Sequence, residues 1–203
     1  MQRKWKIILG ITIPVIVIGG GIGGYALWRF WPATWSTSPP SIDFPVANAD
    51  VIHILGGYGT TDEGWFHNGI DFGCNASVDI IAWCELRVSY INTWYNDKGG
   101  HWQTNVNFRY NTDYSFEVPF ESWALNETYA NLQRAEINVE VGQIIPQGYV
   151  IGKLLYHGSG THIHFGMKEN GQDVCPYLFF SADCKALFDS LWSLYGYGTI
   201  CRP

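Results

Sequence analysis

Short segments rich in β-branched and aromatic residues, separated by turn residues, recur from residue 51 to residue 167. They predict strands at residues 51–55, 78–91, 104–110, 136–141, 149–156 and 162–167. The sequences "NDKGG" (96–100) and "NTD" (111–113) predict turns between strands. Helical spacing of apolar residues appears at 187–195, with Gly196 as a stop signal, and a second short helix is expected at 126–134. We therefore expect a mainly β domain, a single antiparallel sheet of sandwich-like character, with a short C-terminal helix.

A long apolar segment precedes this domain. Residues 7–28, "IILGITIPVIVIGGGIGGYALW", contain no charged residue, and a helix of that length would span a bilayer. Arg3, Lys4 and Lys6 precede the segment and only Arg29 follows it closely, which places the N-terminus in the cytoplasm by the positive-inside rule. A cleaved signal peptide is the alternative. The bulky exit "LWRFWPATW" argues against it, because signal peptides end in small residues.

These features divide the chain into four parts: a basic cytoplasmic tip (1–6), a transmembrane anchor (7–28), a tether rich in Pro, Ser and Thr (29–41) and an extracytoplasmic domain (42–203). The net charge of the chain is −6. Four of its 12 basic residues lie before residue 30, so 8 remain against 18 acidic residues, a charge of −10 beyond that point. So acidic a domain argues against binding to nucleic acid.

Five cysteines fit an oxidising exterior: Cys74, Cys84, Cys175, Cys184 and Cys201. Five thiols allow two disulfides and one unpaired cysteine, in a pattern that the sequence does not determine. We expect a Cys74–Cys84 disulfide and a second bridge among the last three cysteines. A zinc–thiolate cluster is the alternative, but the sequence has no Cys-x-x-Cys pair to support it.

Two short motifs carry potential metal ligands. "HNGID" places His67 and Asp71 four residues apart, and "HIH" places His162 and His164 two residues apart. Even spacings bring side chains to one face of a strand, although a solvent-facing pair would show the same pattern. Two histidines and one aspartate would leave the fourth position of a tetrahedral zinc open, as catalytic zinc sites require. The set is therefore sufficient for metal-assisted hydrolysis by a zinc-activated water.

The motifs "HNGIDFG" (67–73) and "GTHIHFGM" (160–167) resemble those of the lysostaphin/LytM-type zinc metallopeptidases, whose domain is a duplicated hybrid motif. The similarity extends to "GYG" (57–59), "VGQIIPQGYVIGKL" (141–154) and "NGQDVCPYLFF" (170–180). It covers about residues 50–180, in the order and at separations compatible with that family.

The resemblance implies a role for each motif residue. His67, Asp71 and His164 would bind one zinc ion per chain, whereas His162 would be a catalytic residue beside the zinc-activated water or the developing oxyanion. Members of the family cleave peptide links in bacterial cell walls, often next to glycine. Their fold is an antiparallel sheet crossed by a groove.

One segment departs from the family pattern. The family usually carries another active-site histidine in a segment similar to "YSFEVPFES" (114–122), where Phe120 takes the position of that histidine. Glu121 is a candidate auxiliary acid/base beside it. His157 and His101 are further candidates, although each is more typical of a surface histidine.

Three functions follow from these observations. The first is a membrane-anchored zinc metalloendopeptidase that hydrolyses an extracytoplasmic peptide or peptidoglycan-like substrate. The second is a catalytically degenerate member that keeps zinc but binds or regulates an envelope partner, because the histidine expected at Phe120 is absent. The third is an extracellular adhesion or glycan-binding domain with incidental histidines. The sequence does not indicate the oligomeric state.

Overall fold

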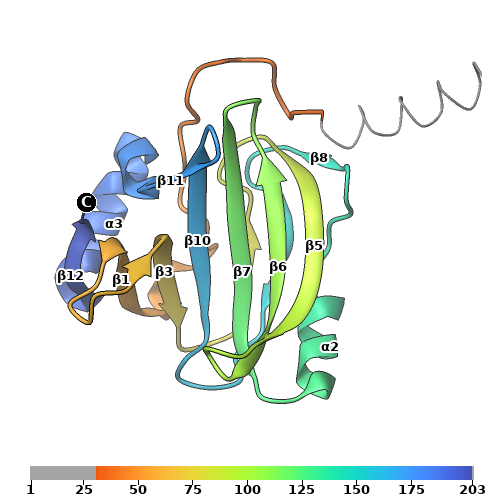
Figure 1. Cartoon of the computed structure of the whole chain (residues 1–203), viewed down its shortest axis with the longest axis vertical. Helices are drawn as coiled ribbons and strands as arrows, with labels where there is room; N and C mark the ends of the chain where they lie inside the picture. Colours follow the sequence, from red (N-terminus) through yellow and green to blue (C-terminus); the bar gives the residue numbers. More distant parts are fainter. Residues whose placement is uncertain (1–30, 203) are drawn as a thin grey trace, which may run out of the picture. The chain divides into compact units, whose positions relative to one another are not determined.

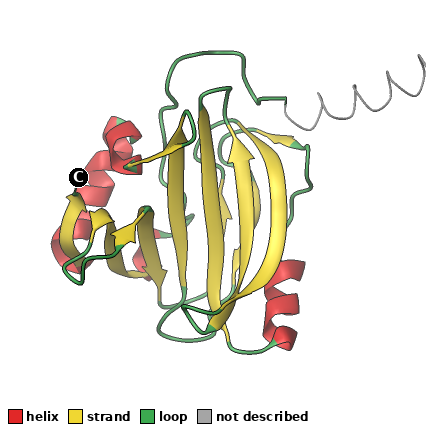
Figure 2. Ribbon diagram, viewed as in Figure 1, coloured by secondary structure: helices red, strands yellow, loops and turns green. Residues whose placement is uncertain are grey.

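One large β-sheet dominates the computed structural model, which describes residues 31–202 (Figures 1 and 2). Across the sheet the strands run β12-β1-β3-β10-β7-β6-β5-β8, with β2 paired to β1 and β11 paired to β10. Their bounds are β1 (Ile52–Thr60), β2 (Phe66–His67), β3 (Gly69–Cys74), β5 (Leu86–Asn96), β6 (His101–Arg109), β7 (Tyr114–Ala124), β8 (Ile144–Ile145), β10 (His162–Glu169), β11 (Gln172–Val174) and β12 (Gly196–Cys201). Among the strands of residues 31–202, β12 pairs in parallel with β1 and the other strand pairs are antiparallel; the isolated bridge between Ile42 and Phe180 is also parallel.

A second, two-stranded sheet of β4 (Val78–Ile81) and β9 (Val150–Leu154) completes the β structure. Between β4 and β5, the fully buried Trp83 packs edge-on against Phe108, Phe116 and Phe165 at centroid distances of 5.3, 5.1 and 4.6 Å. Such aromatic packing contributes to stability beyond the area that it buries. It also fixes which face of the large sheet is apolar, and hence which face is left for polar side chains.

Two helices stand at the sides of the large sheet, α2 (Glu127–Ala135) and α3 (Ala182–Tyr195) (Figure 2). The side chain of Asn126 caps α2 by accepting a hydrogen bond from the Tyr129 N–H, and that of Ser181 caps α3 through the Cys184 N–H. Helix α3 ends at Gly196, as the sequence predicts. Within residues 31–202, the mainly β fold with a large antiparallel sheet and two α-helices confirms the expected β class, although a second, small sheet accompanies the large one.

Two predicted segments differ from the structure, and several of its strands were not predicted. Residues 78–91 form two strands rather than one, because the chain turns at residues 82–85 to place Trp83 in the core. Residues 136–141 form no strand and contribute a single bridge, between Ile137 and Gly152. Strands β3, β7 and β12 were not predicted as separate elements. Strand β7 contains Pro119, which cannot donate a backbone hydrogen bond and so disguises a strand in the sequence.

The pairing of β7 with β10 is interrupted opposite that proline. Register partners include Ile163 with Phe120, and the register resumes only at Gly166 with Glu117. The missing N–H of Pro119 accounts for the gap, because a ladder bond there has no donor. The interruption lies beside His164, and both Pro119 and His164 line a cavity there.

One disulfide, Cys175–Cys201, joins the segment after β11 to the end of β12, which agrees with the expected bridge among the last three cysteines. The expected Cys74–Cys84 disulfide is wrong. Both thiols are free and buried, as is that of Cys184. Cys74 lies inside β3 and Cys84 in the turn beside Trp83, where each is part of the apolar core. Free cysteines commonly behave as small apolar residues in such positions.

Removing the disulfide is expected to destabilise the domain by about 3 kcal/mol, because the bridge closes a loop with a sequence separation of 26 residues and so restricts the unfolded chain. The double variant Cys175→Ser/Cys201→Ser would show the loss in urea unfolding. A reducing agent should lower the stability of the native chain and leave the double variant unchanged. Equal stability of the two proteins without reductant would contradict the prediction.

The expected transmembrane anchor, residues 7–28, lies outside the described residues. Within residues 31–202, neither helix has the length and apolar character that crossing a membrane requires.

Candidate metal centre

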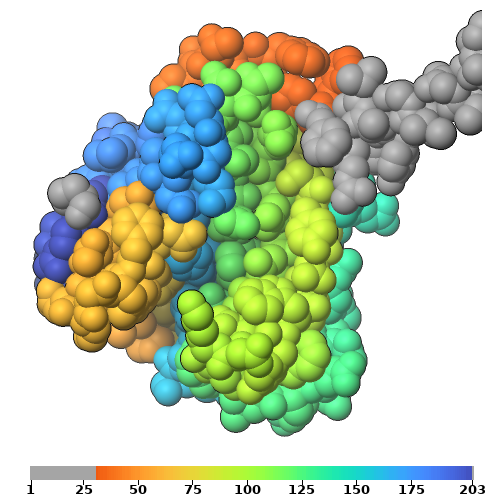
Figure 3. Space-filling model, viewed as in Figure 1, coloured from red at the N-terminus to blue at the C-terminus, as the bar shows by residue number. Residues whose placement is uncertain are grey.

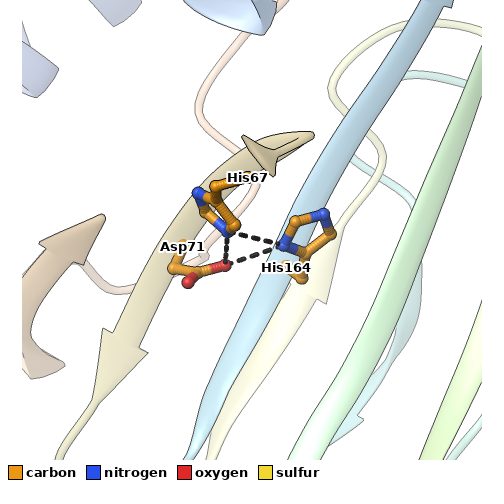
Figure 4. Close-up of side chains that lie close together, drawn as sticks. All are labelled: His67, Asp71 and His164. Carbon is orange, nitrogen blue, oxygen red and sulfur yellow. Dashed lines mark hydrogen bonds and ion pairs between the residues drawn. The ribbon is translucent and has the colours of Figure 1, made fainter. Parts of the chain in front are cut away.

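Three strands bring the motif residues together. His67 ends the short strand β2, Asp71 lies in β3 and His164 lies in β10. Strands β3 and β10 are antiparallel neighbours in which Asp71 stands directly opposite His164. Alternation along β10 sends Ile163, Phe165 and Met167 into the core and leaves the two histidines on the other face. Figure 4 shows the three side chains pointing toward one another.

The ligand atoms form a nearly equilateral triangle. His67 Nε2 lies 3.0 Å from His164 Nδ1 and 3.1 Å from Asp71 Oδ1, and the last two atoms are 2.9 Å apart. His67 Nδ1 donates a hydrogen bond of 2.6 Å to the Gly57 carbonyl, which can only accept. That bond fixes the ring orientation and leaves Nε2 free as a ligand, the arrangement found around metal-bound histidines.

This triangle fits zinc. Tetrahedral zinc with bonds of about 2.0 Å places its ligand atoms about 3.3 Å apart, so an ion requires the side chains to separate by only a few tenths of an ångström. The group brings two imidazoles and one carboxylate within 4.8 Å of one another, and these are the N and O donors of catalytic zinc sites. We identify the cluster as a candidate zinc centre, whose three protein ligands would leave the fourth position of a tetrahedral ion for water or substrate.

Opposite charges hold the cluster in place. Burial acts to raise the pKa of Asp71, but His162, His164 and His67 outweigh it and lower the pKa well below its usual value. Burial likewise acts to lower the pKa of His67, yet the Asp71 carboxylate and the Gly57 carbonyl raise it. Asp71 is therefore an anion throughout the neutral range, which is the form that binds a cation.

Gly69 makes room for His164. The two strands meet at Gly69 and Gly166, and a Cβ on Gly69 would lie 2.6 Å from His164 Nε2 and 2.8 Å from the Phe165 carbonyl. Both distances are too short for real contacts. A glycine is therefore needed at position 69 to leave room for the imidazole.

The variant Gly69→Ala is expected to displace the His164 ring and to weaken zinc binding by at least about 10-fold, as does the loss of other groups that orient metal ligands. Titration with a competing chelator measures the effect, and thermal unfolding checks that the sheet remains intact. An unchanged zinc affinity would show that the strand shifts to accept the methyl group.

His162 lies on the same face, next to the triangle but outside it. Its Nε2 is 3.8 Å from Asp71 Oδ1 and 3.5 Å from Glu121 Oε1, while its Nδ1 donates a hydrogen bond of 2.7 Å to the Gly160 carbonyl. Burial acts to lower the pKa of His162, but Asp71 and Glu121 outweigh it and raise the pKa to about 9.

The position facing His162 in β7 is Glu121, not Phe120. Glu121 pairs directly with His162 across the strands, whereas Phe120 is fully buried in the apolar core. Burial opposes ionisation of Glu121, but His101 and His162 lower its pKa to about 2. The resemblance led us to expect that Phe120 would take the place of the family's other active-site histidine. The structure places the carboxylate of the next residue, Glu121, opposite His162 instead.

The remaining candidates separate clearly. His157 is in contact with Tyr129 and Thr161, and none of its contacts is with the triangle. His101, in contrast, begins β6 and binds Glu121 with its Nε2 at 2.7 Å. The double glycine before His101 was the only signal for it in the sequence, since the link to Glu121 depends on the pairing of β6 with β7.

Three cavities adjoin the cluster. One of about 300 Å³ lies beyond His67, between β1 and β12, and includes Trp65 and Tyr197 in its wall. A second, of about 250 Å³, lies beside His164 and is lined by amides of β5 and β6. A third, of about 220 Å³, lies between Trp123 and Tyr197 and reaches Asp71 and His162. In Figure 3 the lower part of the blue segment is recessed between the orange segment and the yellow-green segment.

Comparison with known proteins shows the fold alone. No family model matches the chain, and no curated protein matches its sequence. A chain of the SpoIIQ–SpoIIIAH pore-forming complex is similar in structure, with 18% identity over 75% of this chain and 99% of that one, and a TM-score of 0.51. Csd3 from Helicobacter pylori aligns with 18% identity over 71% of this chain and 34% of that one, with a TM-score of 0.50. A protein from Pseudomonas aeruginosa that is described as an M23 peptidase aligns with 19% identity over 80% of this chain and 60% of that one, with a TM-score of 0.49. These similarities therefore extend to the mainly β fold and to nothing beyond it.

Proposed function

We propose that the chain is a zinc metalloendopeptidase that hydrolyses peptide bonds of an extracytoplasmic substrate, of which the cross-linking peptides of a cell wall are the best candidates. The observation that carries the proposal is the convergence of His67, Asp71 and His164 into one triangle, with His162 beside it. The membrane anchor at residues 7–28 and the extracytoplasmic location belong to the same proposal and rest on the sequence alone.

His67, Asp71 and His164 would hold the zinc ion. Zinc at such a site supplies a Lewis acid and a nucleophile near neutral pH. Asp71 reduces the net charge of the loaded site, and the Gly57 carbonyl keeps the His67 ring in the ligand orientation.

His162 would transfer a proton or stabilise the negative charge that develops on the carbonyl oxygen during the reaction. The Gly160 carbonyl fixes its Nδ1, so the other ring nitrogen is the one that faces the cavity between Trp123 and Tyr197. Two carboxylates, Asp71 and Glu121, favour its cationic form. A cationic imidazole at this point can donate to a developing oxyanion, and in its neutral form it can accept a proton.

The alternative is a family member that binds zinc but recognises a partner instead of cutting a peptide. The observation that favours it is that Phe120 takes the position of the histidine that the resemblance implies, while the residue that faces His162 is an acid, Glu121. The similarity to a chain of a pore-forming complex is compatible with this alternative but, at 18% identity, extends only to the fold.

The full chain, purified in detergent, provides the test. Its zinc content is measured by elemental analysis, and peptide products from purified cell walls, wall peptides and oligoglycines are measured by mass spectrometry. One zinc per chain, with cleavage that a chelator abolishes and zinc restores, is the expected result. Zinc without cleavage of any of these substrates would favour the alternative, and a folded chain with no affinity for zinc would contradict both.

A further inference from the structure

Glu121 uses its two oxygens on two different histidines. Oε1 lies 3.5 Å from His162 Nε2, whereas Oε2 lies 2.7 Å from His101 Nε2. The exposed fractions of His101 and Glu121 are only 2% and 9%. A buried carboxylate is costly unless it is paired, so the hydrogen bond from His101 is a condition for Glu121 to face the cavity as an anion.

The surroundings of His101 hold the ring firmly. It stacks on Trp123, with centroids 4.2 Å apart and planes 25° from parallel. On the side of the hairpin loop, a Cβ at Gly99 would come within 2.4 Å of the imidazole, so the backbone there closes over the ring. The position of His101 is therefore set by packing and does not depend on the hydrogen bond to Glu121.

Trp123 itself has an unusual backbone conformation, with φ of 61°, in the left-handed region that is unfavourable for a non-glycine residue. Its indole lies against Gly160, where a Cβ would come within 2.4 Å of the ring. The strained residue is thus placed between His101 and the loop that carries the Gly160 carbonyl, the hydrogen-bond partner of His162. Strain of this kind is concentrated at functional sites.

We propose that His101 is a positioning residue of the catalytic site. His101, held by Trp123, fixes Oε2 of Glu121 so that Oε1 faces His162. A histidine of β6 thus orients His162 through a carboxylate, in a site where the histidine expected in β7 is absent. The proposal rests on the proposed function for its catalytic consequence, but the orientation of His162 is independent of turnover.

Two substitutions of His101 separate positioning from packing. His101→Phe keeps a ring on Trp123 but removes the donor to Glu121, whereas His101→Gln keeps an N–H donor close to the position of Nε2. We expect His101→Phe to lower kcat by about 10-fold to 100-fold, with KM and zinc content unchanged, and His101→Gln to recover most of the loss. His157→Phe is the matched control, because His157 also stacks on an aromatic ring, Tyr129, at 4.6 Å and 30°. It should leave kcat unchanged.

A double-mutant cycle tests whether His101 acts through Glu121. In a Glu121→Gln background, His101→Phe should have no further effect on kcat, since the carboxylate that it orients is already absent. This background also removes the charge that His101→Phe would leave buried and unpaired, so if His101→Phe alone does not fold, a lower kcat in the double variant than in Glu121→Gln still contradicts the proposal. Additive losses in the cycle would overturn the proposal.

Side-chain nitrogen NMR supplies a measurement that does not require hydrolysis. The His162 ring signals of the zinc-loaded chain should shift in His101→Phe and return toward native values in His101→Gln, while His157→Phe leaves them unchanged. If the native chain binds zinc but cleaves nothing, the proposed function fails, and the NMR comparison still decides the positioning role. Unchanged His162 signals in His101→Phe would overturn that role.

Discussion

Replacing Asp71 with alanine is expected to weaken zinc binding by more than about 100-fold. Asp71 supplies the only anionic ligand of the triangle, with Oδ1 at 3.1 Å from His67 Nε2 and 2.9 Å from His164 Nδ1. Removing a partner that only orients a metal ligand already costs about 10-fold to 100-fold in affinity, so the loss of a ligand and of its charge costs more. The apparent dissociation constant, measured by chelator competition, reports the change.

Asp79→Ala is the matched control for this variant. Asp79 lies in β4, and its side chain pairs with Lys153, 3.9 Å away at the surface. The substitution Asp79→Ala removes the same charge from the domain without changing the triangle, so the zinc affinity should remain that of the native chain. If Asp71→Ala bound zinc as tightly as Asp79→Ala, the site would have to be located elsewhere, and the proposed ligand set would be wrong.

The clustering of His67, Asp71 and His164 could be predicted from the sequence, partly from local regularities and partly from the resemblance to a known family. Residues two apart in a strand share a face, so His162 and His164 had to project together once β10 was a strand. The resemblance to a known family then paired them with His67 and Asp71, and the antiparallel register of β3 and β10 brings the two motifs together.

The support around His162 was not predictable in the same way. It depends on how β7 aligns with its two neighbours, and a shift of one residue exchanges the faces of the strand. The sequence comparison aligned Phe120 with the expected histidine, but the structure sends Phe120 into the core and turns Glu121 to the site. His101 is 20 residues away from Glu121 along the chain, and the pairing of β6 with β7, which includes an irregularity between Trp102 and Thr104, brings them together.

Cysteine pairing was likewise hard to predict, because it depends on the topology of the sheet. Cys74 and Cys84 are close in sequence and were expected to join, but one lies in β3 and the other in the turn beside Trp83, both within the apolar core. Cys175 and Cys201 are farther apart in sequence and meet because β12 returns to pair with β1. Short separation was a poor guide because sheet topology, and not chain distance, determines which residues become neighbours.

The variant His162→Ala is expected to retain one zinc per chain and to lose between about 10² and 10⁴ in kcat, the range associated with removal of a general acid/base or of an oxyanion donor. The two effects separate because His162 lies outside the ligand triangle, with its Nε2 3.8 Å from Asp71 Oδ1. Its ring shares the cavity with Trp123 and Tyr197, and a substrate carbonyl entering that cavity would meet His162 beside the metal centre.

Measured together, zinc content and kcat distinguish the roles that His162 could have. Native turnover in His162→Ala would show that the proton and the oxyanion are served by other groups, of which Glu121 is the nearest, at 3.5 Å from the lost ring. Loss of zinc together with turnover would instead make His162 part of the metal centre. Native zinc with lost turnover assigns the chemistry to His162, and because the Gly160 carbonyl already fixes its Nδ1, the nitrogen that acts is then Nε2.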